Sequence, residues 1–123
     1  MQEIFEENKS KMLQGLIIWT PMLETGDLIT AKHQETILSD SRVIHFWDPD
    51  RIAGQLLSKT LKLRAPIAWD VYLVYPPGQN WDSELPPSPG FWMHQLDEEL
   101  ALFLSPLRLK GAVQTMIERV KDE

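Results

Sequence analysis

Two dense apolar segments with a proline-rich stretch between them dominate the hydrophobic pattern of this chain. The apolar segments are residues 68 to 75 (AWDVYLVY) and 91 to 96 (FWMHQL), and residues 76 to 90 between them include five prolines. Residues 71 to 75 are β-branched, aromatic or aliphatic without a gap, which is typical of a strand covered on both faces. The pattern predicts an antiparallel hairpin whose first strand lies at the centre of a sheet.

The remaining elements alternate between helices and short strands. Apolar residues at helical spacing predict helices, and brief apolar runs predict buried strands. Asp48 before Pro49, and Ser105 before Pro106, are helix-start signals, whereas residues 97 to 104 fit either a helical turn or an extended connector. The expected helices cover residues 2 to 12, about 27 to 38, 49 to 63 and 106 to 120, and the other expected strands cover residues 16 to 19 and 42 to 47.

The order of these elements predicts a single α/β domain. A strand, a helix and a second strand in succession predict a parallel pair with right-handed crossovers, and the hairpin adds two strands that run antiparallel to each other. With 123 residues the chain is long enough for one hydrophobic core. We therefore expect one domain over residues 1 to 123.

This order, with Pro66 just before the third strand, resembles the thioredoxin fold over nearly the whole chain. The resemblance implies a four-stranded mixed sheet, βαβαββα with an extra N-terminal helix, and helices on both faces. It also implies that Leu23 and Gly26 stand where the family has its redox cysteines, and that Pro66 matches the family's cis proline. The phrases WTPML, HFWDPD, AWDVYLVYP and FWMHQL look like those of uncharacterised bacterial proteins of this fold, which implies no activity.

The composition removes several classes of function. The chain has no cysteine, which excludes disulfides, thiolate nucleophiles and cysteine-ligated metals, and with them thiol-disulfide oxidoreductase activity. The formal net charge of −6 opposes binding to nucleic acid, because that affinity comes largely from Lys and Arg. Lys59, Lys62 and Arg64 do cluster, but at the end of an expected helix, where cations complement the helix dipole without a ligand.

The hydropathy pattern indicates a soluble protein. No apolar run approaches the roughly 20 residues needed to cross a bilayer, and the acidic, polar start of the chain differs from a secretion signal. We therefore expect a cytoplasmic protein without a membrane partner, unless a leader was removed. The oligomeric state is left open.

In the expected fold, one edge of the sheet gathers the strand ends that could form a binding site. Ligands of open α/β sheets favour the carboxyl ends of parallel strands, and three tryptophans near this edge could form an aromatic cleft. The competing interpretation is that these rings belong to core and edge packing. The candidate binding residues, including one in the proline-rich loop, are Trp19, Thr20, Pro21, Trp47, Asp48, Pro66, Trp69, Trp81 and His94.

The evidence for catalysis is thin. His45, His94, Asp48 and Asp70 are suitable types for a metal ligand or general base, but their spacing follows no ligand pattern. His45 lies in an apolar strand, where a hydrogen-bonded structural role is favoured, and Asp48 is explained by helix capping. Thr20 lacks an evident base. We expect no metal and no cofactor, and leave the catalytic residues unassigned.

The proline-rich loop is the second candidate binding element. Residues 76 to 90 are too many for a tight hairpin turn, and connections of this length tend to be functional or disordered. Trp81 is a large ring in otherwise polar sequence, and tryptophan is over-represented among interface hot spots. A loop that presents Trp81 to a protein partner and a loop folded back onto the domain carry equal weight at this stage.

These observations lead to two hypotheses. The first is a redox-inactive thioredoxin-like domain that binds a protein or ligand through the tryptophan-rich edge and the loop. The second is a small enzyme or metal-binding protein that uses His94, His45 and Asp48 at that edge. The identity of the ligand or partner is left open.

Overall fold

The structure, a computed structural model, describes residues 2 to 21 and 40 to 121. These residues divide into two compact units, Met1–Ala53 and Gly54–Glu123. The elements are α1 (Gln2–Glu7), β1 (Gly15–Trp19), β2 (Val43–Trp47), α3 (Ile52–Leu61), β3 (Val71–Val74), β4 (Phe91–His94), the 3-10 helix η1 (Leu100–Leu102) and α4 (Pro106–Lys121). The helix predicted over residues 27 to 38, and Leu23 and Gly26, lie outside the described residues.

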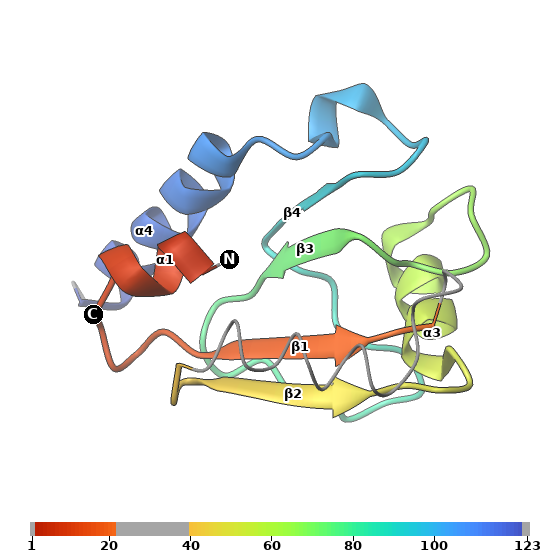
Figure 1. Cartoon of the computed structure of the whole chain (residues 1–123), viewed down its shortest axis with the longest axis horizontal. Helices are drawn as coiled ribbons and strands as arrows, with labels where there is room; N and C mark the ends of the chain where they lie inside the picture. The colour runs from red at the N-terminus through yellow and green to blue at the C-terminus, as the bar shows by residue number, and fades with distance from the viewer. Residues whose placement is uncertain (1, 22–39, 122–123) are drawn as a thin grey trace. The chain divides into compact units, whose positions relative to one another are not determined.

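The first unit contains a parallel pair of strands. β1 pairs with β2 in register from Gly15 opposite Val43 to Trp19 opposite Trp47, and Figure 1 draws them as neighbouring arrows that point the same way. At the far end the Asp48 N–H donates to the Trp19 carbonyl oxygen at 2.8 Å. The predicted parallel pairing is therefore confirmed.

Arg42 joins the N-terminal helix to this strand pair. Its guanidinium donates to the carbonyl oxygens of Phe5 (2.7 Å), Asn8 (2.6 Å) and Ser10 (3.0 Å), and it binds both carboxylate oxygens of Asp40 at 2.8 and 2.9 Å. The planar guanidinium has five donors, so one side chain can satisfy several carbonyl groups that the end of α1 leaves without helical partners. The Arg42 side chain is only 15% exposed as a result.

The N-terminal helix is shorter than predicted because polar side chains form hydrogen bonds with the backbone N–H groups that follow Glu7. The Asn8 side-chain oxygen accepts the Ser10 N–H at 3.1 Å, and the Ser10 hydroxyl oxygen accepts the Met12 N–H at 3.2 Å. Such local side-chain bonds compete with helical hydrogen bonds. The helix consequently ends at Glu7 rather than near Met12.

Asp48 performs the predicted capping role, but the helix starts later than expected. Its carboxylate oxygens accept the N–H groups of Ile52 at 3.0 Å and Ala53 at 2.9 Å. Arg51 has a left-handed φ of 59°, which separates the turn that contains Pro49 from the helix. Pro49 therefore precedes α3 instead of occupying its first position.

The second unit contains the predicted hairpin. β3 and β4 pair antiparallel, with Val71 opposite His94 and Val74 opposite Phe91. All four residues of β3 are half-buried. The hairpin itself is thus confirmed, but β3 has one hydrogen-bonded neighbour and does not occupy the centre of a sheet.

The prediction of a four-stranded thioredoxin-like sheet is wrong. The described strands form two separate two-stranded sheets, one parallel and one antiparallel. In addition, the peptide bond before Pro66 is trans, unlike the cis bond that the resemblance implied. The hydrophobic runs indicated where the strands lie. They do not specify which strands pair with each other, so they could not show that the two pairs form separate sheets.

The core of the second unit lies between the hairpin and α4. Its buried apolar side chains are Ala68, Met93, Leu109, Val113 and Ile117. The connector before α4 combines both predicted forms, since η1 is followed by extended backbone at Phe103. The Leu104 N–H then donates to the His94 carbonyl oxygen at 2.7 Å. The Ser105 hydroxyl oxygen then accepts the Arg108 N–H at 3.3 Å, which confirms the predicted cap of α4.

Gly54 allows α3 to approach the backbone that leads into β3. The Ala68 N–H donates to the Gly54 carbonyl oxygen at 2.8 Å, and a Cβ atom at Gly54 would lie 2.7 Å from Ile67 Cγ2. The helix and this segment therefore touch at a point where only glycine fits. Among the residues described, no helix has both the length and the apolar character needed to cross a membrane.

We predict that Gly54→Ala and Gly111→Ala have opposite effects on stability, although both glycines lie inside helices. Gly54→Ala overpacks the contact with Ile67 and should lower the free energy of unfolding by about 1–3 kcal/mol. Gly111 has open space where its Cβ would lie, so Gly111→Ala should raise that free energy by about 0.5–1 kcal/mol. Urea denaturation of both variants measures the difference, and an equal response of the two would contradict the close approach at Gly54.

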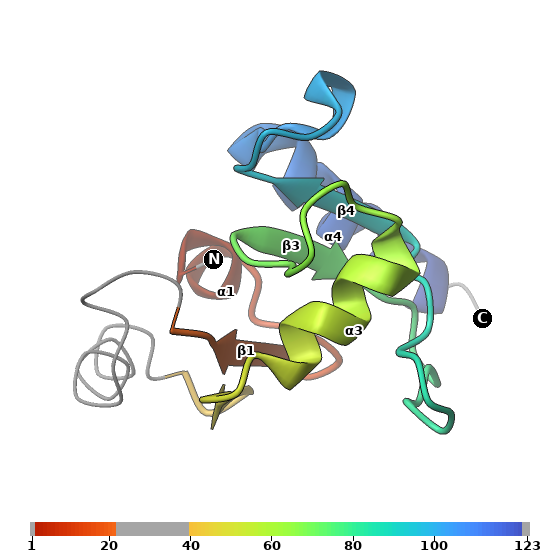
Figure 2. The same cartoon turned by 90° about the vertical axis from the view of Figure 1, so that its right-hand side faces the viewer.

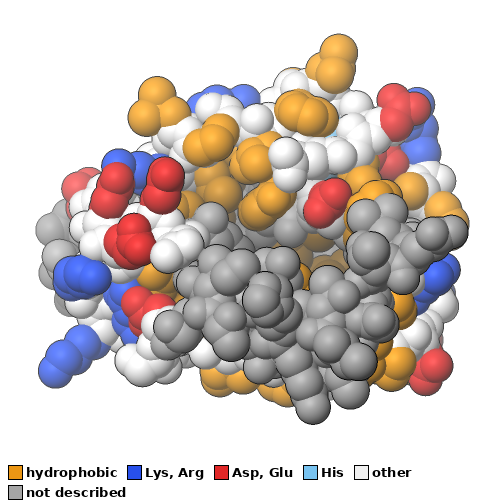
Figure 3. All heavy atoms as spheres, viewed as in Figure 1, with side chains coloured by type: hydrophobic (Ala, Val, Ile, Leu, Met, Phe, Trp, Pro, Cys, Tyr) orange, Lys and Arg blue, Asp and Glu red, His pale blue; other side chains and the backbone are white. Residues whose placement is uncertain are grey.

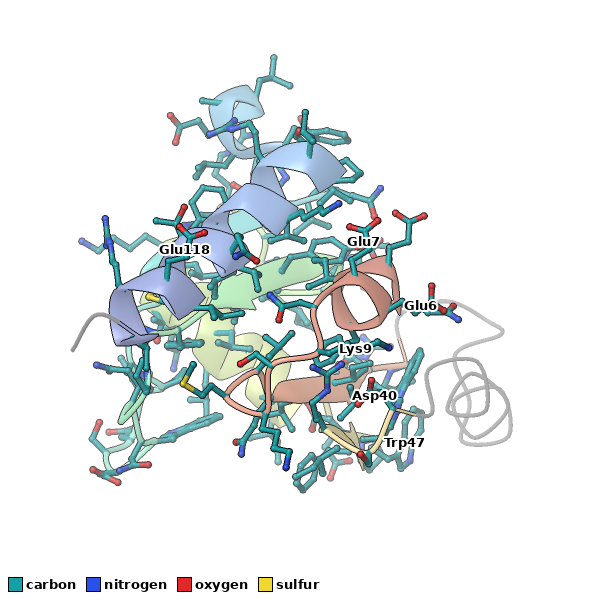
Figure 4. The ribbon with its side chains drawn as sticks, turned by 90° about the vertical axis from the view of Figure 1, so that its left-hand side faces the viewer. Glu6, Glu7, Lys9, Asp40, Trp47 and Glu118 are labelled. Carbon is teal, nitrogen blue, oxygen red and sulfur yellow. The ribbon has the colours of Figure 1, made fainter. Side chains whose placement is uncertain are left out.

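We also predict that the Asp40 and Arg42 pair contributes to stability above about pH 4 and loses that contribution in acid. The Arg42 guanidinium holds the pKa of Asp40 well below its usual range, and Lys9, labelled beside Asp40 in Figure 4, lowers that pKa further. Because the folded-state pKa is the lower one, the unfolded chain takes up a proton first as the pH falls, and stability decreases. Denaturation curves of wild type and Asp40→Asn between about pH 2 and pH 6 should show a flatter pH dependence for the variant. A pH dependence of Asp40→Asn as steep as that of wild type would contradict the role of this pair.

Candidate functional site

The ends of β1 and β2 bring together the predicted site residues of the first unit. Trp19 and Trp47 are direct neighbours in the strand register, and Asp48 follows immediately. The Trp19 indole N–H donates to His45 Nδ1 at 3.0 Å, and the two ring planes are within 6° of parallel with centroids 6.0 Å apart. Thr20 lies next to this pair and is half-buried. The predicted structural role of His45 thus has a specific partner.

Pro21 and Asp48 at these strand ends are already engaged by neighbouring backbone and side chains. The Pro21 carbonyl oxygen accepts Arg51 Nε at 3.0 Å, while the Asp48 carboxylate caps α3. Asp48 therefore satisfies the first two N–H groups of α3 from a position before the N-cap residue. The strand ends have a clear structural explanation.

His94 is a structural residue at the centre of the second unit. Its side chain is fully buried, and the ring centroids of Trp92 and Phe103 each lie 5.7 Å from that of His94, with the Phe103 ring nearly perpendicular to it. Nδ1 accepts the Leu96 N–H at 3.0 Å, so Nε2 carries the proton and donates to the Glu99 carbonyl oxygen at 2.8 Å. Both ring nitrogens are occupied, so His94 is poorly placed to ligate a metal or to act as a general base.

Pro66 lies on the wall of an open cavity of about 480 Å³ at the C-terminal end of α3. Lys59, Lys62 and Arg64 also line this cavity, but Trp69, Trp81 and His94 do not. The Ala65 N–H donates to the Glu98 carboxylate and lowers the pKa of Glu98. Burial opposes this effect, but the N–H and guanidinium of Arg64, which also bind the carboxylate, lower the pKa further, so the net shift is downward. Arg64 therefore has an acidic partner, while Lys59 lies in the last turn of α3, whose carbonyl end favours positive charge.

The predicted common edge loses its basis because the four-stranded sheet is wrong. Five of the candidate residues belong to the first unit and the other four, Pro66, Trp69, Trp81 and His94, to the second. In the part of the chain that is described, no group of three or more His, Cys, Asp or Glu side chains could hold a metal ion. The remaining candidate is the loop with Trp81.

The loop between β3 and β4 has a firmly attached base. The Tyr75 hydroxyl donates to the Pro87 carbonyl oxygen at 2.8 Å, and the Thr60 hydroxyl of α3 donates to the Pro86 carbonyl oxygen at 2.9 Å. Pro86 is buried, and Figure 2 shows the loop extending beyond the hairpin and returning beside α3. Burial raises the pKa of Tyr75, so its hydroxyl remains a hydrogen-bond donor at neutral pH.

The tip of this loop, residues 77 to 85, is exposed throughout. Trp81 has 45% of its surface exposed and Leu85 39%. Asp82 and Glu84 stand between them, and the whole of residues 76 to 90 contains no Lys or Arg. The tip therefore presents two large apolar side chains and two negative charges.

The loop anchors are the residues that sequence reasoning missed. Thr60 occupies an apolar helix, and Tyr75 ends an apolar strand, so each was interpreted only through its element. One signal in the sequence could have identified Thr60 and Tyr75: a hydroxyl group next to apolar, buried residues needs a hydrogen-bond partner. Their carbonyl acceptors, however, lie 26 and 12 residues away in sequence and could not be identified without the fold.

Comparison of the chain with protein-family models, with curated proteins and with solved structures found no match. The likeness to thioredoxin-fold proteins consequently receives no support from these comparisons.

We predict that Tyr75→Phe loosens the loop, whereas Tyr72→Phe does not. Tyr75→Phe leaves the Pro87 carbonyl oxygen without its donor, which should cost about 0.5–1.5 kcal/mol. Tyr72 donates instead to the Gln95 side chain at 2.9 Å, away from the loop. Cleavage after Glu84 by a glutamate-specific protease, followed by mass spectrometry, should be faster in Tyr75→Phe and unchanged in Tyr72→Phe. Equal cleavage of the two variants would mean that the Tyr75 bond does not hold the loop.

Proposed function

We propose that this protein is a protein-binding module and that the loop tip, residues 77 to 85, is its contact element. The observation that carries the proposal is the exposed Trp81 ring on a loop with an anchored base. An exposed tryptophan contributes little to the fold, but it is one of the residues that dominate binding energy at protein interfaces. Anchoring of Pro86 and Pro87 limits the conformational entropy that binding would cost.

The chemistry of the tip defines the kind of partner that fits it. Trp81 and Leu85 require an apolar pocket, and Asp82 and Glu84 require Lys or Arg at the rim of that pocket. The net charge of −6 supports the same choice, because long-range attraction would favour a basic partner surface. The partner is therefore a protein with a basic-rimmed apolar pocket.

The alternative of an enzyme or metal protein is not favoured by the same geometry. The residues on which that hypothesis depended are His94, His45 and Asp48. His94 has both nitrogens bonded within the fold, His45 accepts the Trp19 indole N–H, and Asp48 caps a helix.

We predict that Trp81→Ala abolishes capture of the partner and leaves the fold intact. Immobilised protein would first be used to isolate partners, which are then purified and measured by calorimetry. Removal of a tryptophan at the centre of an interface costs about 2 kcal/mol or more of binding free energy, so the dissociation constant should rise at least roughly 30-fold. Asp82→Lys combined with Glu84→Lys should also weaken binding and remove most of its salt dependence.

Phe46→Ala is the matched control, because Phe46 is an aromatic residue of the first unit with 53% of its surface exposed. It should bind like wild type, and circular dichroism should show the same fold for all variants. Equal partner affinity for wild type and Trp81→Ala would refute the role of the tip. Comparable losses in Trp81→Ala and Phe46→Ala would indicate nonspecific adhesion of exposed rings.

A further inference from the structure

A second exposed apolar surface lies on the connector between β4 and α4. Residues 100 to 107 read LALFLSPL, and Ser105 is the one polar residue among them. Leu100 is 84% exposed, Leu107 80% and Phe103 45%. We call these three side chains the connector patch; Figure 3 shows apolar side chains along the upper edge, where Figure 1 draws η1 and the start of α4.

The exposure of the connector patch is not a by-product of how α4 packs. Leu109, Val113 and Ile117 form the buried stripe of that helix, whereas Leu107 lies outside the stripe. A solvent-exposed position on a helix is ordinarily polar. Large apolar side chains gathered at exposed positions mark an interaction surface.

The patch is held in a fixed shape. Arg108 Nη1 donates to the Ala101 carbonyl oxygen at 3.0 Å, and the Leu104 N–H donates to the His94 carbonyl oxygen at 2.7 Å. The Phe103 ring also stands edge-on to the buried His94 ring. Binding to this surface would therefore require little reorganisation.

Opposite charges flank the patch at its two ends. Asp97, Glu98 and Glu99 precede it, and Arg64 pairs with Glu98, so the acidic flank keeps an excess of negative charge. Arg108 and Lys110 follow it, and both are exposed. The order along the chain is acidic, apolar, basic.

We infer that the connector patch binds a second copy of this chain, related to the first by a two-fold axis. A two-fold interface brings the same surface of two copies together in reversed direction, so residue i meets residue j and residue j meets residue i. Reversal places Leu100 against Leu107 of the other copy and Glu99 against Arg108. The surface is therefore complementary to itself in both polarity and charge, and this interaction is separate from the one proposed for the loop tip.

The first experiment measures the mass in solution by light scattering during size-exclusion chromatography. The chain mass is 14.2 kDa, and the wild type should show twice that value and dissociate on dilution. Leu107→Ser should lower the measured mass towards that of the monomer. The dissociation constant of the dimer should rise at least about tenfold, because the substitution is present twice in a two-fold interface. Ile44→Ser, which alters an aliphatic residue of β2 with 59% of its surface exposed, should leave the dimer unchanged.

The second experiment tests the reversed arrangement. Glu99→Lys and Arg108→Glu should each weaken the dimer. Arg108→Glu also removes the bond to the Ala101 carbonyl oxygen, so the double variant should recover only the part of the affinity that was lost through charge and should bind more tightly than Arg108→Glu alone. A double variant as weak as the single ones would overturn the two-fold geometry.

A wild type that stays monomeric at its highest soluble concentration would overturn the inference. So would a dimer that survives Leu107→Ser, or one that is lost in Trp81→Ala instead, since the latter would assign self-association to the loop tip. A monomer that binds phospholipid vesicles through Leu107 would overturn it as well. Loss of partner binding in Trp81→Ala with the dimer intact keeps the two surfaces distinct.

Discussion

The pairing of β3 with β4 is the constraint on which the second unit depends. Val74 opposite Phe91 and the bond from the Gly90 N–H to the Val74 carbonyl oxygen fix both ends of the intervening loop. The same pairing places Met93 and His94 in the interior, where both side chains are fully buried. The position of the loop is therefore a result of strand register, and its direction is set afterwards by the Thr60 and Tyr75 hydroxyl groups. A long loop needs such attachment, since its closure otherwise costs conformational entropy.

The polar residues that suggest chemistry in the sequence are largely engaged in building the fold. Asp48 caps a helix, His94 joins the hairpin to its connector, and Arg42 satisfies the carbonyl groups after α1. Each side chain forms a hydrogen bond with a backbone group that would otherwise lose its water without gaining a partner, and so avoids that cost in free energy. Among the described features that lack such a structural explanation are exposed apolar side chains, including the ring at the loop tip and the leucines of the connector. Function is consequently argued from exposed hydrophobic side chains rather than from titratable ones.

Hydrophobic periodicity predicted the strands, α3 and α4 to within a few residues, because burial dictates which side chains face inward. It failed where backbone donors and acceptors decide the outcome. Asn8 and Ser10 ended α1 early, Arg51 delayed α3, and the division into two sheets overturned the expected architecture. Trp81 could be identified as a candidate because a lone ring in polar sequence is unusual, whereas the connector patch was not recognised, since apolar residues at 100 to 107 resemble an ordinary core segment until their exposure is known.

The bond between the Leu104 N–H and the His94 carbonyl oxygen also protects the outer edge of β4. A strand with a free edge can recruit a foreign strand and so begin uncontrolled aggregation. At His94 the chain's own connector occupies the position that such a strand would take, and the bridge between His94 and Phe103 stops after a single step. Any strand added from outside would first have to displace that connector, so self-association by edge extension is blocked at this end of the hairpin.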